Sequence, residues 1–227
     1  MKRIRDEYKA QIRDNIALKN LSKINNQNVT ELEISIPGKP IQMNLIPHTV
    51  HTLKFNYNFE NLPLEIPPNI ISVHFYEFSD RIEELPNTIE NIDIYKGFNH
   101  PVDKLHNNIK SICFGWNFNQ PIDNLPTSLE KIILGAWFTH SINNLPPNIK
   151  FIHIGNPDYN HISILKLPQS IVFLQLATNE DFDLDFGLDI NNNFNYVCQL
   201  EKNYSASGIN SYTNALYYKN YYFTKIT

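Results

Sequence analysis

The sequence predicts a repeat solenoid built mainly from short β-strands. A leucine or isoleucine, usually followed by proline, recurs seven times between residues 46 and 168, at steps of 19 to 22 residues. In each copy, further large apolar residues follow four, seven and nine positions later. A fixed period of about 20 residues is typical of stacked repeats that bury one continuous core between neighbours. Because seven copies keep this spacing, we expect a solenoid.

The last two apolar positions of each copy predict a β-strand. They lie two residues apart, which is the period of a strand that buries one face. In chain order, the pairs are Leu53 and Phe55, Val73 and Phe75, Ile92 and Ile94, Ile112 and Phe114, Ile132 and Leu134, Ile152 and Ile154, and Leu174 and Leu176. A weaker, earlier copy contains Leu32 and Ile34. The pattern L-x-x-L-x-L is leucine-rich-repeat-like, and we expect about eight short parallel strands on the concave side.

The rest of each copy predicts a convex side without ordinary helices. About a dozen residues remain outside the strand, too few for a typical helix and two turns. The recurring proline fixes φ at the bend and favours an extended residue before it. We therefore expect extended or single 3-10 segments, packed on an aromatic column. This column contains Phe59, Phe78, Phe98, Phe118, Phe138 and Tyr159.

Asparagines near the start of the strands are expected to hold the turns. An asparagine side chain can bond its own nearby backbone and so stabilise a bend. The residues in this place are Asn69, Asn87, Asn108 and Asn148.

Residues 1–24 predict a short N-terminal amphipathic helix. Ile4, Tyr8, Ile12 and Ile16 step by four residues, which places them on one helical face. We expect this helix to cap the first rung, because the ends of a solenoid need shielding. A helix that docks on a partner is the alternative.

Residues 25–178 carry the repeats, and residues 179–227 predict an irregular C-terminal cap or tail. From Asp181 to Ile190, acidic and apolar residues alternate, as in a half-buried terminal strand. A calcium site on Asp181–Asp189 is an alternative, although the glycine and glutamate of an EF-hand loop are missing. The tyrosine-rich remainder is expected to cover the last rung, with partner binding as its alternative.

Composition argues against several classes of partner. A net charge of −4 disfavours nucleic acid and anionic membranes. No apolar stretch approaches the ~18 residues of a membrane span, and the first twenty residues lack the apolar run of a secretory signal. Two cysteines, Cys113 and Cys198, are too few for a disulfide framework. We expect an intracellular, cytoplasmic monomer.

No motif indicates catalysis, so we expect neither enzyme activity nor a cofactor. G-x-S-x-G, Walker A and H-E-x-x-H do not occur. His74 and His153 lie four repeats apart, about 19 Å at strand spacing, which is too far to share a metal ion. His100 and His140 lie two repeats apart, about 10 Å. We expect these histidines to be polar side chains that face solvent.

The side chains that alternate with the core should face out of the concave side. On this face the early repeats are polar and charged with two tyrosines, and the later repeats turn apolar around Ile133, Phe151 and Phe173. Aromatic and apolar residues on such a face are the anchors that protein partners use. The candidate partner-binding residues are Lys54, His74, Tyr76, Asp93, Tyr95, Ile133, Phe151 and Phe173.

Three glycines follow consecutive strands at the same place in the repeat, namely Gly115, Gly135 and Gly155. They predict either a repeated turn that requires φ > 0 or a shallow trough beside the apolar late repeats.

Two segments resemble the FNIP repeat family, a short relative of leucine-rich repeats known mainly from amoebae and the giant viruses that infect them. The segment Phe118-Asn119-Gln120-Pro121-Ile122-Asp123-Asn124-Leu125-Pro126 is similar to the family signature, and Phe138 to Pro146 is similar with His140 and Ser141 substituted. The resemblance covers about residues 46 to 176. It implies a recognition solenoid, often joined to an F-box, and the host cytoplasm as location if the protein is viral. No F-box is visible in residues 1–24.

The leading functional hypothesis is a non-catalytic repeat scaffold that binds a protein partner, of unknown identity, on its concave face. A substrate adaptor in ubiquitin-ligase-type degradation is the alternative that the family resemblance implies. A calcium-binding or enzymatic role through Asp181–Asp189 is a further alternative.

Overall fold

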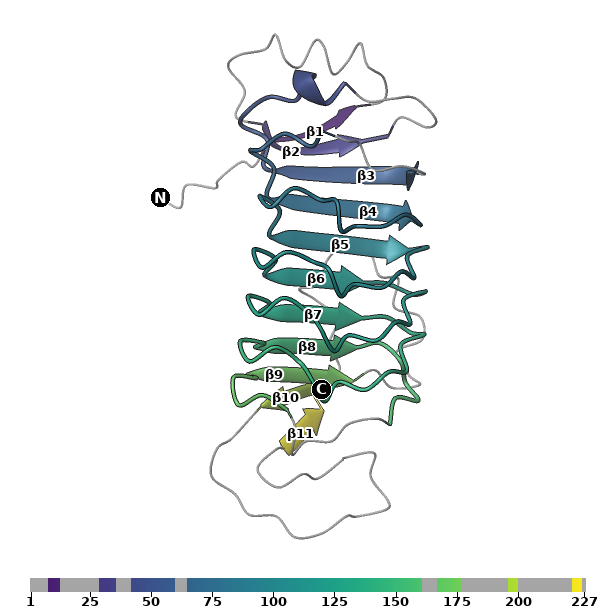
Figure 1. Ribbon diagram of the computed structural model, residues 1–227. Coiled ribbons are helices and arrows are strands. Elements are labelled where there is room, and N and C mark those ends of the chain that lie inside the picture. The colour runs from purple at the N-terminus through teal and green to yellow at the C-terminus, as the bar shows by residue number, and fades with distance from the viewer. Residues whose placement is uncertain are drawn as a thin grey trace, which may run out of the picture.

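The computed structural model describes residues 8–12, 29–35, 42–59, 65–160, 167–176, 196–199 and 222–225. Within these residues, a single sheet of eleven strands runs along the molecule in chain order (Figure 1). The strands are β1 (Tyr8–Ile12), β2 (Val29–Ile34), β3 (Thr52–Phe59), β4 (Ser72–Phe78), β5 (Asn91–Lys96), β6 (Ser111–Phe114), β7 (Lys131–Leu134), β8 (Phe151–Ile154), β9 (Phe173–Leu176), β10 (Tyr196–Gln199) and β11 (Tyr222–Lys225). One short 3-10 turn, η1 (Met43–Leu45), precedes β3.

The predicted repeat solenoid is confirmed. Strands β2 to β9 contain the predicted apolar pairs, and each is parallel to the next. The register sets equivalent positions of the repeat against each other, so that Ile92 pairs with Ile112 and Ile112 with Ile132. Each strand from β2 to β8 therefore buries its apolar pair on the same side of the sheet, Leu174 of β9 joins them, and the copies share one core.

The convex segments are extended and joined by tight turns, as expected. The carbonyl of Pro86 accepts a hydrogen bond from the amide of Ile89 at 3.0 Å, and Pro126 does the same for Leu129. Six of the seven copies carry a proline at this position of the turn, the last of them Pro168. The remaining copy carries His106 instead. These turns deliver each chain segment to the start of its strand in a constant geometry.

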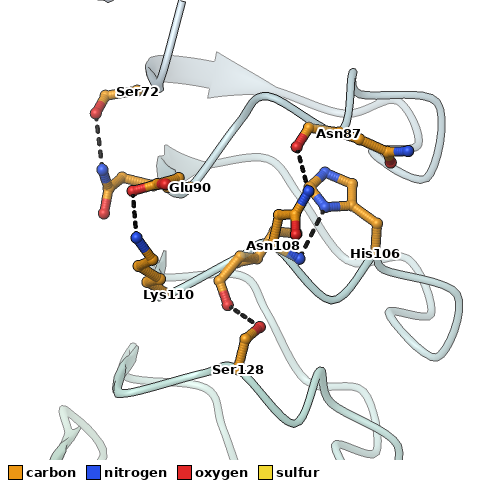
Figure 2. A network of polar contacts seen from close by, with 9 residues as sticks. Ser72, Asn87, Glu90, His106, Asn108, Lys110 and Ser128 are labelled. Atoms are coloured by element: carbon orange, nitrogen blue, oxygen red, sulfur yellow. Dashed lines mark hydrogen bonds and ion pairs between the residues drawn. The ribbon is translucent and has the colours of Figure 1, made fainter.

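Asparagine side chains connect neighbouring rungs. The Nδ2 atom of Asn69 donates to the carbonyl of Val50 at 2.6 Å, that of Asn108 to Asn87 at 2.7 Å, and that of Asn148 to Thr127 at 2.9 Å (Figure 2 for Asn108). The expectation that they bond their own turn is wrong. The stacking of rungs places the carbonyl of the preceding rung within reach, and this satisfies a backbone group that the sheet does not use.

Stacked aromatic rings fill the convex half of the core. The ring centroids of Phe98 and Phe118 lie 5.9 Å apart, those of Phe118 and Phe138 6.3 Å, and those of Phe138 and Tyr159 5.9 Å. Their interplanar angles are between 2° and 26°. Such pairs contribute about 0.5–1.5 kcal/mol each beyond the area they bury.

Of the predicted N-terminal helix, residues 1–24, the structure describes residues 8–12, and these do not form a helix. Tyr8–Ile12 forms strand β1, which pairs in parallel with β2. A spacing of four residues is also two periods of a strand, and Tyr8, Ala10 and Ile12 alternate with polar residues. The same sequence pattern therefore fits an additional strand at this end of the sheet.

The sheet continues beyond β9 with a change of direction. β10 pairs antiparallel with β9, and β11 pairs antiparallel with β10. Two strands thus lie in the segment that was expected to be irregular. The predicted strand and the alternative calcium site at Asp181–Asp189 lie outside the described residues. Among the described residues, no helix is long and apolar enough to cross a membrane.

Candidate interaction surface

The central outward column forms a continuous line across the sheet. Strand register places Lys54 beside His74, His74 beside Asp93, and so on through the column. Glu33 precedes Lys54 in this column, and Cys113, Ile133 and His153 follow Asp93. The sequence-predicted column is therefore one surface, although its two halves differ in exposure.

The early half of the column consists of half-buried polar pairs. Lys54 Nζ lies 3.0 Å from Glu31 Oε1, and His74 Nδ1 lies 2.7 Å from Asp93 Oδ2. These four side chains are 17–20% exposed. Because these side chains pair across neighbouring strands, this half presents polar groups at fixed positions.

Two tyrosines stand beside these pairs at the C-terminal ends of β4 and β5. The rings of Tyr76 and Tyr95 are stacked with centroids 5.3 Å apart and an interplanar angle of 16°. Lys96 Nζ lies 5.0 Å from the centroid of the Tyr76 ring and 3.2 Å from Glu77 Oε2. Tyr76 is 49% exposed. It is the one predicted contact residue that is both aromatic and exposed.

The late half of the column is buried. Ile133 is 5% exposed and His153 is 7% exposed. The expectation that both face solvent is wrong, because orientation out of a strand does not by itself decide how much water reaches a side chain. Phe151 and Phe173, also predicted, are half-buried and stacked at 4.6 Å, with Lys131 Nζ 5.2 Å from the Phe151 ring.

Cys113 is a free thiol between the two halves of the column. Burial raises the pKa of this thiol far above its ordinary value, and the nearby carboxylate of Asp93 raises it further. The thiolate is the nucleophilic form of cysteine, so this environment opposes nucleophilic chemistry at Cys113.

Two of the three predicted glycines, Gly115 and Gly135, serve close packing of the backbone. A Cβ atom on Gly115 would lie 1.6 Å from the carbonyl oxygen of Tyr95, and one on Gly135 would lie 2.2 Å from that of Gly115. Both glycines are buried, as is Gly155, and none has a positive φ; Gly97 does, at 89°. Both sequence interpretations, the φ > 0 turn and the open trough, are therefore wrong. Neighbouring rungs approach too closely at this point for any side chain.

Two histidines on the convex side, His100 and His140, bond to backbone carbonyls. His100 Nε2 lies 2.7 Å from the carbonyl oxygen of Ser79, and His140 Nε2 lies 3.2 Å from that of Asn119. Since a carbonyl only accepts, both Nε2 atoms carry the proton. In the described part of the chain, no three His, Cys, Asp or Glu side chains lie close enough to hold a metal ion.

A charged column at the start of the strands was not singled out from the sequence. Glu90 Oε2 lies 2.8 Å from Lys110 Nζ, and Glu130 Oε2 lies 2.8 Å from Lys150 Nζ (Figure 2 for the first pair). The sequence signal is an alternation of acidic and basic residues at steps of 20 residues. It becomes visible only when the residues that immediately precede the strands are compared between copies.

Fold and surface together define this chain as a β-solenoid repeat scaffold of leucine-rich-repeat type. The family model of the FNIP Repeat matches residues 98–136. The resemblance to that family is thereby confirmed for these residues.

Comparison with solved structures gives a match to CroV588, described as a novel circular LRR protein. The identity is 24% and the TM-score is 0.47, and the match covers 66% of this chain and 27% of that chain. This chain therefore spans well under half of the length of CroV588. A comparison with curated proteins found no match.

Proposed function

We propose that the protein is a non-catalytic scaffold that binds a partner protein on its concave face, with Tyr76 as the central anchor. The observation that supports this most is the exposure of Tyr76, at 49%, on a face whose other described side chains are largely half-buried or buried. Tyrosine is enriched among the residues that dominate protein interfaces.

Tyr76 is also held in place before any partner arrives. One side of its ring stacks on Tyr95, and Lys96, itself paired with Glu77, lies over the ring. Binding has to offset the ordering of side chains at an interface, about 0.5–1.5 kcal/mol for each mobile one. A ring that is already fixed avoids most of this loss.

The polar pairs beside Tyr76 would contribute to the specificity of binding more than to its affinity. Lys54, His74 and Asp93 present charged and polar groups in a fixed row, and complementary polar groups mainly set specificity and the rate of association. The Phe151–Phe173 ring pair lies on the same face further along the sheet and offers a second apolar contact. Ile133 is too deeply buried to contribute directly.

Affinity capture with the full chain tests this proposal. Wild type, Tyr76→Ala and Trp137→Ala are immobilised in equal amounts. Proteins that each retains from a lysate of the cells in which the protein naturally occurs are quantified by mass spectrometry. Loss of a central tyrosine anchor typically costs 2 kcal/mol or more, which is roughly a 30-fold loss of affinity.

We expect a partner that is retained by wild type and by Trp137→Ala and is lost with Tyr76→Ala. Trp137 is the matched control because it is an exposed aromatic residue, 59% accessible, outside the strands. Equal retention of every captured protein by all three variants would contradict the proposal.

A further inference from the structure

A single exposed column at the starts of the strands has a self-complementary order. One residue immediately before or at the start of each strand from β4 to β9 contributes to it. The members in order are Ile71, Glu90, Lys110, Glu130, Lys150 and Val172. The column thus reads apolar, negative, positive, negative, positive, apolar.

The backbone holds these six residues in line. The amide of Lys110 donates to the carbonyl of Glu90 at 2.8 Å, the amide of Glu130 to Lys110 at 2.8 Å, and the amide of Lys150 to Glu130 at 2.7 Å. The amide of Glu90 donates to the carbonyl of Ile71 and that of Val172 to the carbonyl of Lys150, each at 2.8 Å. Beyond Ile71 the ladder continues to the exposed His51, which precedes β3. The strand starts lie one above another along one edge (Figure 1). The spacing is therefore one strand separation, about 4.8 Å, at every step.

The side chains of the column reach solvent. The charged ones are 37–54% exposed, and Ile71 and Val172 are 37% and 66% exposed. Ile71 and Val172 are thus two of the four exposed large hydrophobic residues in the described part of the chain, and they stand at the two ends of one charged row.

We propose that this column is a docking surface for a second copy of the same chain, arranged antiparallel about a two-fold axis between β6 and β7. In that arrangement the second copy's column runs in reverse. Ile71 then faces Val172, Glu90 faces Lys150, and Lys110 faces Glu130, each pair formed twice as an isologous interface requires. In a parallel arrangement, every charge would face a like charge.

Two intrachain ion pairs already exist in the column, Glu90 with Lys110 and Glu130 with Lys150. The dimer adds an opposite charge from the partner to each of these four groups, which makes one network of alternating sign. Because exposed ion pairs are individually weak and screened by salt, the dimer should be reversible and sensitive to ionic strength. This inference does not depend on the concave face and departs from the monomer expected from the sequence.

Sedimentation velocity of the full chain, at several concentrations in low and high salt, tests the proposal. We expect wild type to form dimers at low salt and to dissociate when about 0.5 M salt screens the charges. Lys110→Glu places two glutamates opposite each other twice and should weaken dimerisation about tenfold or more. Lys104→Glu, the same charge change at an exposed lysine outside the column, should leave the dimer intact.

Mixing two variants distinguishes this arrangement from any other charged contact. Lys110→Glu and Glu130→Lys each repel a copy of themselves, but an antiparallel pair of the two has opposite charges at every facing position. We expect each variant to sediment as a monomer alone and an equimolar mixture to form dimers. Monomeric wild type at every salt concentration, equal disruption by Lys104→Glu, or no dimer in the mixture would overturn the proposal.

Discussion

His106 occupies a position where the other six aligned copies of the repeat carry proline. Its Nδ1 atom accepts a hydrogen bond from the amide of Asn108 at 3.3 Å (Figure 2). Burial lowers the pKa of this histidine below its ordinary value, and the carbonyl of Pro86 partly opposes that effect. The folded protein therefore favours the neutral ring, which can keep Nδ1 as an acceptor.

The lowered pKa of His106 makes a contribution to stability that depends on pH. As pH falls through about 6.5, the histidine of the unfolded chain takes up a proton before that of the folded chain does. The contribution is present above that pH and is lost below it. The variant His106→Pro removes this group and restricts the unfolded chain at a site where the backbone of other copies accepts proline, which stabilises by about 0.4–1 kcal/mol.

Urea denaturation at pH 7.5 and pH 5 checks this prediction. We expect His106→Pro to be more stable than wild type at both values, with the larger advantage at pH 5. Since all other titrating groups are shared, the difference between the two proteins isolates residue 106. A variant that is less stable than wild type, or an advantage that shrinks at pH 5, would contradict the account.

For other single residues, the sequence predicts the direction of the side chain but not its burial. The alternation of each strand correctly placed Tyr76 and Tyr95 on one face, because side-chain direction follows from the period alone. It could not tell that Ile133 is buried, since burial depends on what lies around a side chain and not on its direction. The glycines were recognised as a pattern, but a close approach of backbones from rungs 20 residues apart has no local signature.

At the scale of the elements, the aromatic stack connects the rungs most directly. Phe118 is 1% exposed and its ring lies 4.1 Å from that of Phe114 and within 6.3 Å of those of Phe98 and Phe138. Phe118→Ala should therefore lower the free energy of unfolding by about 3–5 kcal/mol, the usual cost of a large aromatic cavity.

Equilibrium denaturation compares this loss with that of Trp137→Ala, an aromatic truncation one residue from the next ring of the stack. Because Trp137 is exposed, its removal should change stability by about 0.5 kcal/mol or less. Comparable losses in the two variants would show that the stack does not support the solenoid as described.

The elements themselves were predictable where the repeat is regular. Seven strands from β3 to β9 follow from two apolar residues at fixed distance from a turn, because only stacking can bury them. The N-terminal strand was mistaken for a helix because Tyr8 and Ile12 satisfy both periods. The bonds of Asn69, Asn108 and Asn148 to the preceding rung require the three-dimensional stack, which local turn chemistry does not describe.

At the scale of the whole molecule, each rung depends on its neighbours for both core and backbone bonds. The carbonyl of Glu90 accepts the amides of Lys110 and Ser111, at 2.8 and 3.1 Å, and the same double contact recurs at Lys110 and Glu130. Such a frame holds outward side chains at fixed spacing while leaving their identity free to vary. The frame can therefore be predicted from the sequence, whereas the proposed partner would depend on which side chains the outward columns carry.

The binding role of the concave face is tested most directly by hydroxyl-radical footprinting of the full chain, alone and with the protein that Tyr76→Ala fails to capture. The account predicts that oxidation of Tyr76 falls several-fold in the complex while that of Trp137 stays unchanged. Unchanged oxidation of Tyr76, with protection at Trp137 or elsewhere, would contradict it and place the binding surface outside the concave face.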